Sequence, residues 1–136
     1  MKHIHESIIG RKGVGYQKYE LTNETCKTYH GEILYRIKAL KGIPLMKVKK
    51  GDLGGWIESY DNLDQKGDCW VADDAWVYGE AQVYDNAKIY GNAVVCDRAK
   101  VYGNAKVYGY AQIYGDAKVH GDAEVDYKVN SGKITK

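Results

Sequence analysis

The sequence of 136 residues contains no phenylalanine, one proline and only three cysteines, although it has 13 tyrosines and 16 glycines. No stretch approaches the roughly 18 apolar residues that a membrane-spanning helix needs. The first residues, MKHIHESIIGRKG, lack the apolar run of a secretory signal. Cys26, Cys69 and Cys96 are scattered and odd in number, which argues against a disulfide framework and a structural zinc site. These absences predict a cytoplasmic protein without a membrane partner.

Charge is distributed unevenly along the chain. Residues 1–50 hold 11 Lys and Arg against 4 Asp and Glu, a net charge of +7, whereas residues 51–136 hold 9 against 14, a net charge of −5. This asymmetry indicates units with different surfaces. We expect a basic N-terminal cap over residues 1–50, a repeat unit over 51–129 and a C-terminal cap or tail over 130–136.

A six-residue repeat dominates the second half of the sequence. From Ala75 the chain divides without insertion into AWVYGE, AQVYDN, AKIYGN, AVVCDR, AKVYGN, AKVYGY, AQIYGD, AKVHGD and AEVDYK. The Ala and the Val or Ile two places later point to the same side of a short strand, and Gly, Asp and Asn then form a corner. The frame extends backwards, with weaker flanks, through Leu63, Ile57 and Leu53.

Three such units would close one turn of a coil, so residues 18 apart should stack. The inward columns are uniform: Val71, Ile89, Val107 and Val125; Val77, Val95 and Ile113; Val83, Val101 and Val119. We therefore predict an all-β fold, a parallel β-helix of about four 18-residue turns with a small N-terminal β cap. The alternative is an antiparallel meander with Gly-Asn turns, whose four-residue strands would pair poorly by themselves.

The unit VYGNAK resembles the hexapeptide repeat of left-handed parallel β-helix proteins, and the resemblance covers residues 53–129. It implies a left-handed coil, an exception to the usual right-handed crossover. The leader VKKGDLGGWIESYDNLDQKGDCWV, residues 48–71, is similar to that of uncharacterised bacterial and phage-borne β-helix proteins, some of them labelled putative transferases. This similarity implies a role in host interaction, such as binding and blocking a host factor.

The N-terminal unit reads as strands YQKYEL and YHGEILYRIKAL around a polar turn. We expect a hairpin that covers the lower end of the coil, preceded by a loose arm over residues 1–15. Its cations are interleaved with tyrosines, a pattern that can hold phosphates and stack bases. The nucleic-acid candidates are Lys18, Arg36, Lys38, Lys47, Lys49 and Lys50. A solvated strand face is the simpler interpretation.

Few residues suggest catalysis. His120 is the single histidine of the repeat, and no insertion interrupts residues 69–128 to cover a substrate. An acyltransferase-like enzyme with a site between subunits therefore stays an alternative. Cys96 faces outward without a neighbouring base to activate it.

Metal chemistry has equally little support in the sequence. His3 and His5 form a weak pair near the terminus, and His30 lies apart from them. We expect neither a metal centre nor a cofactor.

The three outward faces of the predicted coil differ in charge. Face two carries Gln82, Lys100, Lys118, Tyr84, Tyr102 and His120, and face three carries Lys88, Lys106, Glu124, Tyr90, Tyr108 and Asp126. Face one carries no charge: its residues are Trp76, Tyr78, Val94, Cys96, Gln112 and Tyr114. We predict that face one binds protein, either a partner or further copies of the chain, with a trimer the most common arrangement by analogy. The leading hypothesis is a non-enzymatic scaffold.

Overall fold

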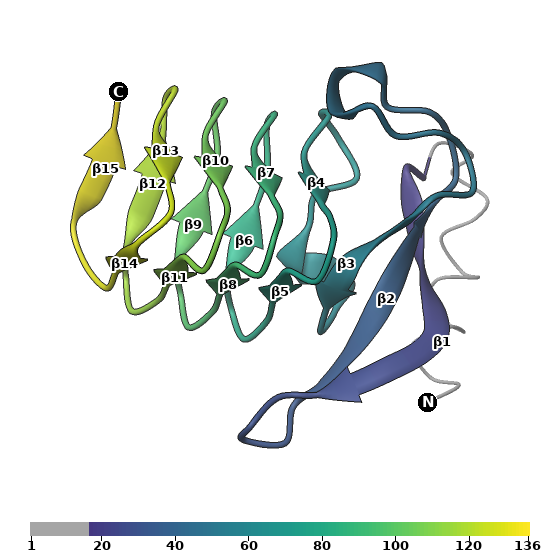
Figure 1. Cartoon of the computed structure of the whole chain (residues 1–136), viewed down its shortest axis with the longest axis horizontal. Coiled ribbons are helices and arrows are strands. Elements are labelled where there is room, and N and C mark those ends of the chain that lie inside the picture. The colour runs from purple at the N-terminus through teal and green to yellow at the C-terminus, as the bar shows by residue number, and fades with distance from the viewer. Residues whose placement is uncertain (1–16) are drawn as a thin grey trace.

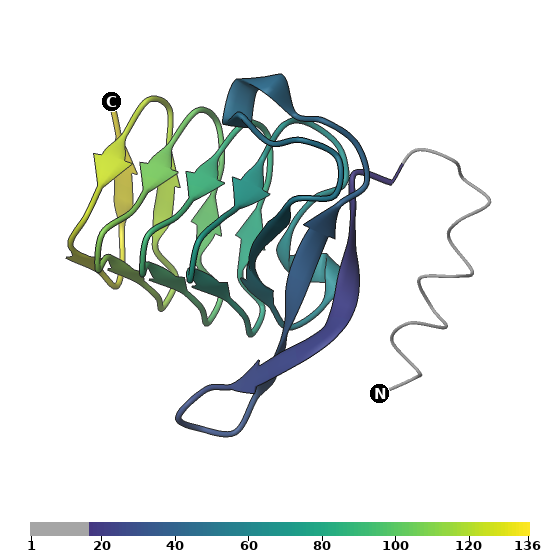
Figure 2. The ribbon, with the colours of Figure 1, turned by 45° about the vertical axis from the view of Figure 1, so that its right-hand side comes forward.

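The computed structural model describes residues 17–136, so the expected arm over residues 1–15 lies outside this range. An antiparallel hairpin stands at one end of a coil of short parallel strands (Figures 1 and 2). The hairpin strands β1 (Tyr19–Lys27) and β2 (Ile33–Ala39) are followed by β3 (Leu53–Ile57). The remaining strands are β4 (Trp70–Val71), β5 (Trp76–Val77), β6 (Gln82–Val83), β7 (Lys88–Ile89), β8 (Val94–Val95), β9 (Lys100–Val101), β10 (Lys106–Val107), β11 (Gln112–Ile113), β12 (Lys118–His120), β13 (Glu124–Val125), β14 (Lys128–Val129) and β15 (Lys133–Thr135). The 3₁₀ turns η2 (Pro44–Met46) and η3 (Tyr60–Asn62) lie in the connections.

The coil strands stack into three sheets, one along each side of the turn. One sheet contains β4, β7, β10 and β13, a second contains β6, β9, β12 and β15, and β5, β8, β11 and β14 extend the sheet that begins with β1, β2 and β3. Residues 18 apart pair in parallel, as Val77 does with Val95 and Val83 with Val101. The predicted parallel β-helix of about four turns is confirmed, and the antiparallel meander is wrong.

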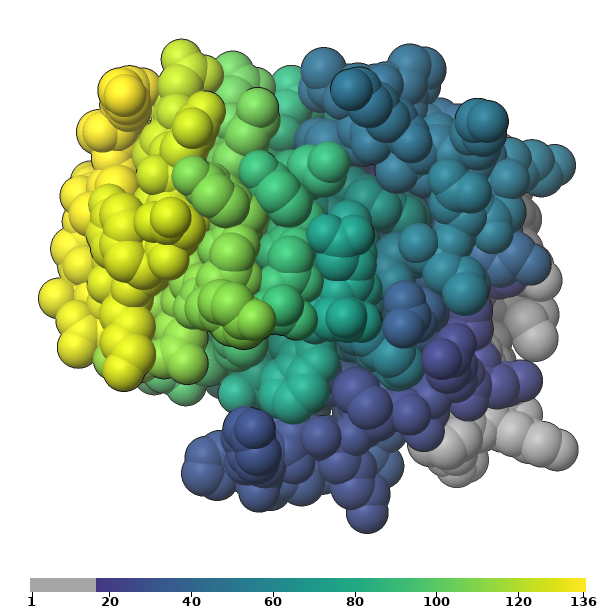
Figure 3. Space-filling model, viewed as in Figure 1, coloured from purple at the N-terminus to yellow at the C-terminus, as the bar shows by residue number. Residues whose placement is uncertain are grey.

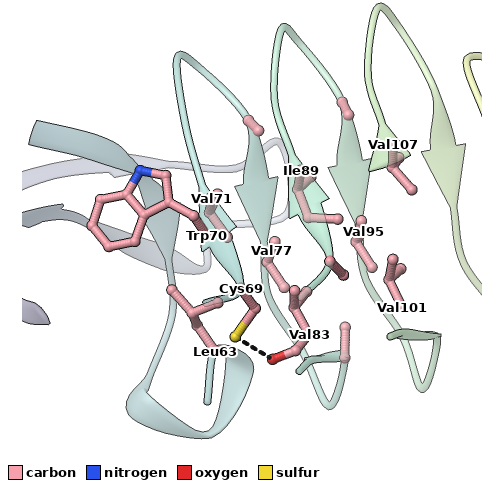
Figure 4. Close-up of a cluster of buried hydrophobic side chains, with 14 of the residues drawn as sticks. Leu63, Cys69, Trp70, Val71, Val77, Val83, Ile89, Val95, Val101 and Val107 are labelled. Atoms are coloured by element: carbon pink, nitrogen blue, oxygen red, sulfur yellow. Dashed lines mark hydrogen bonds between the residues drawn. The ribbon is translucent and has the colours of Figure 1, made fainter. Parts of the chain in front are cut away.

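The interior of the coil is a narrow column of aliphatic side chains. Val77, Val83, Val95 and Val101 point into it from successive strands (Figure 4). The alanine that opens each hexapeptide is buried beside them. Burying one valine side chain contributes about 1.5–3 kcal/mol, so the column supplies the stability that two-residue strands cannot supply alone.

The six-residue spacing breaks at the start of the coil. Ile57 pairs with Val77 and Leu63 with Val83, each 20 residues apart rather than 18, because the connection after Leu63 holds two extra residues. Ile57 and Leu63 still fill the core columns. Leu53 does not: it lies opposite a β2 residue and is 54% exposed, so its predicted place in the inward frame is wrong.

The spacing shortens again at the other end. Gln112 pairs with Lys128, 16 residues later, and Lys118 pairs with Lys133, 15 residues later. Residues 130–136, which the sequence suggests as a cap, therefore contribute β15 to the sheet of β6, β9 and β12.

Each corner of the coil requires a residue with positive φ. Most are glycines, but Asp73, Asp85 and Asp97 adopt φ values of 57°, 57° and 58°. The carboxylates of these residues accept hydrogen bonds, at 2.9, 3.0 and 2.8 Å, from the backbone N–H groups one turn later of Gly91, Gly103 and Gly115. This backbone conformation costs a residue with a Cβ about 1–2 kcal/mol, and the hydrogen bonds to the next turn offset part of that cost.

The hairpin closes the lower end of the coil. Tyr19, Tyr35 and Ile37 belong to the same buried cluster as the coil core. The Tyr19 hydroxyl donates a hydrogen bond to the Leu63 carbonyl oxygen, and the rings of Tyr19 and Tyr60 stack with centroids 5.5 Å apart. Because β2 pairs antiparallel with β3 and β3 pairs parallel with β5, the hairpin and the coil share one continuous sheet.

Candidate binding surface

Face one forms the outward side of the continuous sheet, on β5, β8 and β11. Trp76, Val94 and Gln112 lie directly opposite one another across these strands. The row continues to Trp56 and Arg36 in one direction and to Lys128 in the other. Charged residues therefore occupy only the two ends of this row.

The turn between β1 and β2 converts face one into a groove. The groove has a volume of about 260 Å³ and is lined by all six face-one residues together with Ile113 and Tyr29. The Tyr29 ring lies 6.4 Å from the Trp76 ring, centroid to centroid. The hairpin tip stands out beside the coil (Figure 3). The structure thus brings the six sequence-predicted residues together beneath a residue, Tyr29, that the sequence analysis did not place there.

Tyr29 is held in position although it makes little contact with the protein. Its side chain is 97% exposed. The neighbouring Thr28 is buried, its hydroxyl donates to the Glu32 carboxylate, and the backbone N–H groups of His30 and Glu32 donate to its oxygen. Hydrogen bonds between the backbones of Thr28 and Glu32 and of Gly31 and Thr28 close the turn. The tip is therefore an ordered turn that presents an aromatic ring to solvent.

Arg36 fastens the hairpin to the first turn of the coil. Its guanidinium lies 4.4 Å from the Trp56 ring centroid and donates to the Gly54 carbonyl oxygen at 2.9 Å. Glu24 and Asp74 carboxylates lie 3.7 and 3.9 Å from it. These contacts join β1, β2, β3 and the coil, so the wall and the floor of the groove are connected.

The floor of the groove is uncharged at neutral pH. Burial is the main cause that raises the pKa of Tyr78, and Cys96, Glu32 and Asp97 add to this effect. Burial also raises the pKa of the Cys96 thiol, although its hydrogen bond with Tyr78 opposes this. A neutral thiol without a base is a poor nucleophile. The floor is therefore suited to apolar and aromatic groups rather than to covalent chemistry.

Lys18 was predicted to contact nucleic acid, and this prediction is wrong. The side chain is fully buried, and its ammonium donates to the carbonyl oxygens of Gly67 at 3.1 Å and Cys69 at 2.7 Å. Burial lowers the pKa of Lys18, while the neighbouring Cys69 opposes the shift. The Gln65 side chain, in the lengthened connection after Leu63, accepts hydrogen bonds from the Lys18 and Tyr19 N–H groups. Lys18 thus anchors the hairpin to the coil.

The other nucleic-acid candidates occupy different environments. Arg36 is engaged with Trp56 and the surrounding acidic groups. Lys38, Lys49 and Lys50 are exposed, and Lys47 lines a separate groove against face three. The predicted set therefore does not act as one surface, because two of its six members have partners within the protein.

The histidines of the described chain are dispersed. The His120 ring stacks on Tyr102 with centroids 4.9 Å apart, and Tyr102 stacks on Tyr84 at 4.8 Å, all on face two. Among residues 17–136, no three His, Cys, Asp or Glu side chains are grouped to hold a metal ion. His3 and His5 lie outside the described residues. Within the same range, no helix has the length and apolar character required to span a bilayer.

Comparison with known proteins identifies the fold of the coil. A family model described as YdcK Beta solenoid repeat matches residues 81–97, which contain β6, β7 and β8. None of the curated proteins matches the chain. The match, together with the stacked parallel turns, shows that this part of the chain is a β-solenoid.

Proposed function

We propose that the protein acts without catalysis, by binding a second copy of its own chain through the groove over face one. The observation that carries this proposal is the uncharged groove beneath Tyr29, a 97% exposed ring on an ordered turn. A preorganised aromatic side chain supplies contact area without a large loss of conformational entropy on association.

A second copy fits this surface for a geometric reason. Copies related by a closed rotation would bring their uncharged faces together, and each hairpin tip would lie over the neighbouring copy. The opposing surfaces would then exclude water from Trp76, Tyr78 and Val94, which are all partly exposed in the single chain. The resemblance to left-handed hexapeptide proteins favours a left-handed coil and a trimer by analogy.

A charge at the centre of face one tests the proposal. Val94 lies between Trp76 and Gln112 in the register of the sheet. We expect multi-angle light scattering to give a multiple of the 15.3 kDa chain mass for the wild type and a smaller species for Val94→Lys. A buried, unpaired ammonium would cost more than the interface could return.

The matched control is Gln82→Lys, which places the same charge at the corresponding position of face two. It should leave the assembly unchanged, and circular dichroism should show that both variants keep the fold. A monomeric wild type at micromolar concentration would show that the second copy is not the occupant. In that case a host protein, suggested by the similarity of residues 48–71 to phage-borne proteins, becomes the partner to examine.

A further inference from the structure

A second groove lies on face three and plays no part in the proposed function. It has a volume of about 390 Å³ and separates the loop at η2 from the strands β7 and β10. Its lining residues are Leu45, Met46, Lys47, Asn86, Lys88, Asn104 and Lys106. The lining therefore contains three lysines and no carboxylate.

These lysines are close together because of the fold. Lys88 and Lys106 are register partners on adjacent parallel strands, so their side chains leave the sheet one above the other. Lys47 approaches from the opposite wall. No ion pair is found for any of the three within residues 17–136, where the ion-paired cations are Arg36 and Arg98. Like charges stacked at strand spacing repel one another unless an anion or solvent compensates them.

The backbone at Lys47 is strained in a way that the fold alone does not require. Lys47 adopts φ 58° and ψ 38°, the left-handed region that a lysine seldom occupies. Buried Ile43 and Met46 anchor the loop in the core, and Ile43 and Val48 form an antiparallel bridge around it. The loop thus holds the Lys47 backbone in a fixed position at the groove. Glycine would satisfy the same backbone without strain.

The remaining walls supply different chemistry. Leu45 is 61% exposed and, with Met46, gives the groove an apolar side. Asn86 is oriented by the Asp68 N–H, which donates to its oxygen at 3.2 Å. Asn104 donates to the Asp122 carboxylate at 3.3 Å, and Asp122 itself lies outside the lining. The groove therefore offers cations and amides on one side and an apolar surface on the other.

We propose that this groove binds a small organic phosphate, with the phosphate groups held by Lys47, Lys88 and Lys106 and an uncharged organic part resting on Leu45 and Met46. Phosphate oxygens form charge-assisted hydrogen bonds with ammonium groups, and these are stronger than neutral ones. The volume accommodates a mononucleotide-sized ligand rather than a long polymer.

Calorimetric titration of the full chain with pyrophosphate and with ADP tests the proposal. ADP supplies both the anion and an uncharged ring system, so it should bind more tightly than pyrophosphate. Lys88→Gln and Lys106→Gln should each weaken ADP binding about tenfold, the loss expected for one charge-assisted hydrogen bond. The matched control is Lys100→Gln, which removes a lysine from the corresponding position of face two and should leave the affinity unchanged.

Lys47→Gly separates ligand binding from folding. It preserves the left-handed backbone while removing the ammonium, so the melting temperature should stay the same or rise while ADP affinity falls about tenfold. Absence of ADP binding to the wild type would overturn the proposal, and so would an equal loss for Lys100→Gln. Tighter binding of a single-stranded oligonucleotide with the same lysine dependence would replace the small ligand with nucleic acid.

Discussion

At the scale of single residues, Asp85 shows how one side chain serves two turns. Its φ of 57° is unfavourable for any residue with a Cβ, and its carboxylate accepts a hydrogen bond from the Gly103 N–H at 3.0 Å. We expect Asp85→Ala to lower the free energy of unfolding by about 1–3 kcal/mol, because it keeps the strain and loses the hydrogen bond. Asp85→Gly loses only the hydrogen bond and should cost less. Urea denaturation would measure both, and equal losses would contradict the role of the positive φ.

The cysteines give a prediction that depends on pH. Burial raises the pKa of all three thiols, Cys26, Cys69 and Cys96. The thiolate is the reactive form, so its fraction at pH 7.5 is smaller in the folded chain than in the unfolded one. Iodoacetamide should therefore label the folded protein slowly, and the rate should increase as the pH rises above the ordinary value of about 8.5. Peptide mass spectrometry would detect the contrary result, rapid labelling of Cys96 in the folded state.

At the scale of the strand, neighbouring residues of β9 have opposite environments. Val101 is fully buried in the core column, whereas Lys100 points outward. Val101→Asp should destabilise the fold by more than about 4 kcal/mol, because it buries a charge without a partner. Lys100→Asp should change stability by no more than about 0.5 kcal/mol. Thermal melts of the pair measure this contrast, and similar melting temperatures would show that Val101 does not face the interior.

The same scale explains what the repeat could predict. The two-residue period within each unit and the 18-residue spacing identify Val77, Val95 and Ile113 as inward without any structure. The spacing fails after Leu63, because the two extra residues in the connection carry Gln65, whose side chain binds the first hairpin strand. Such an insertion satisfies contacts with a segment about 46 residues away in sequence, which local periodicity does not detect.

At the scale of the whole molecule, the sequence identified the uncharged face but not the groove above it. Face one follows from the repeat because its residues share one column system. Tyr29 belongs to a different unit and reaches the groove only because β2 pairs with β3 and β3 with β5. Lys18 was misassigned for the same reason, since its acceptors at Gly67 and Cys69 lie on the coil. Contacts between units of unlike sequence pattern were therefore the part that the sequence did not predict.

Hydroxyl-radical footprinting of the assembled protein tests the central claim most directly, because it reports which aromatic side chains are covered. Comparison of the wild type with Val94→Lys should show Tyr29, Trp76 and Tyr114 protected only in the wild type. Tyr102 and Tyr108, on faces two and three, should be modified equally in both proteins. Protection of Tyr102 or Tyr108, with Tyr29 and Trp76 fully accessible, would contradict the account, because the copies would then meet through a charged face and leave the uncharged groove open.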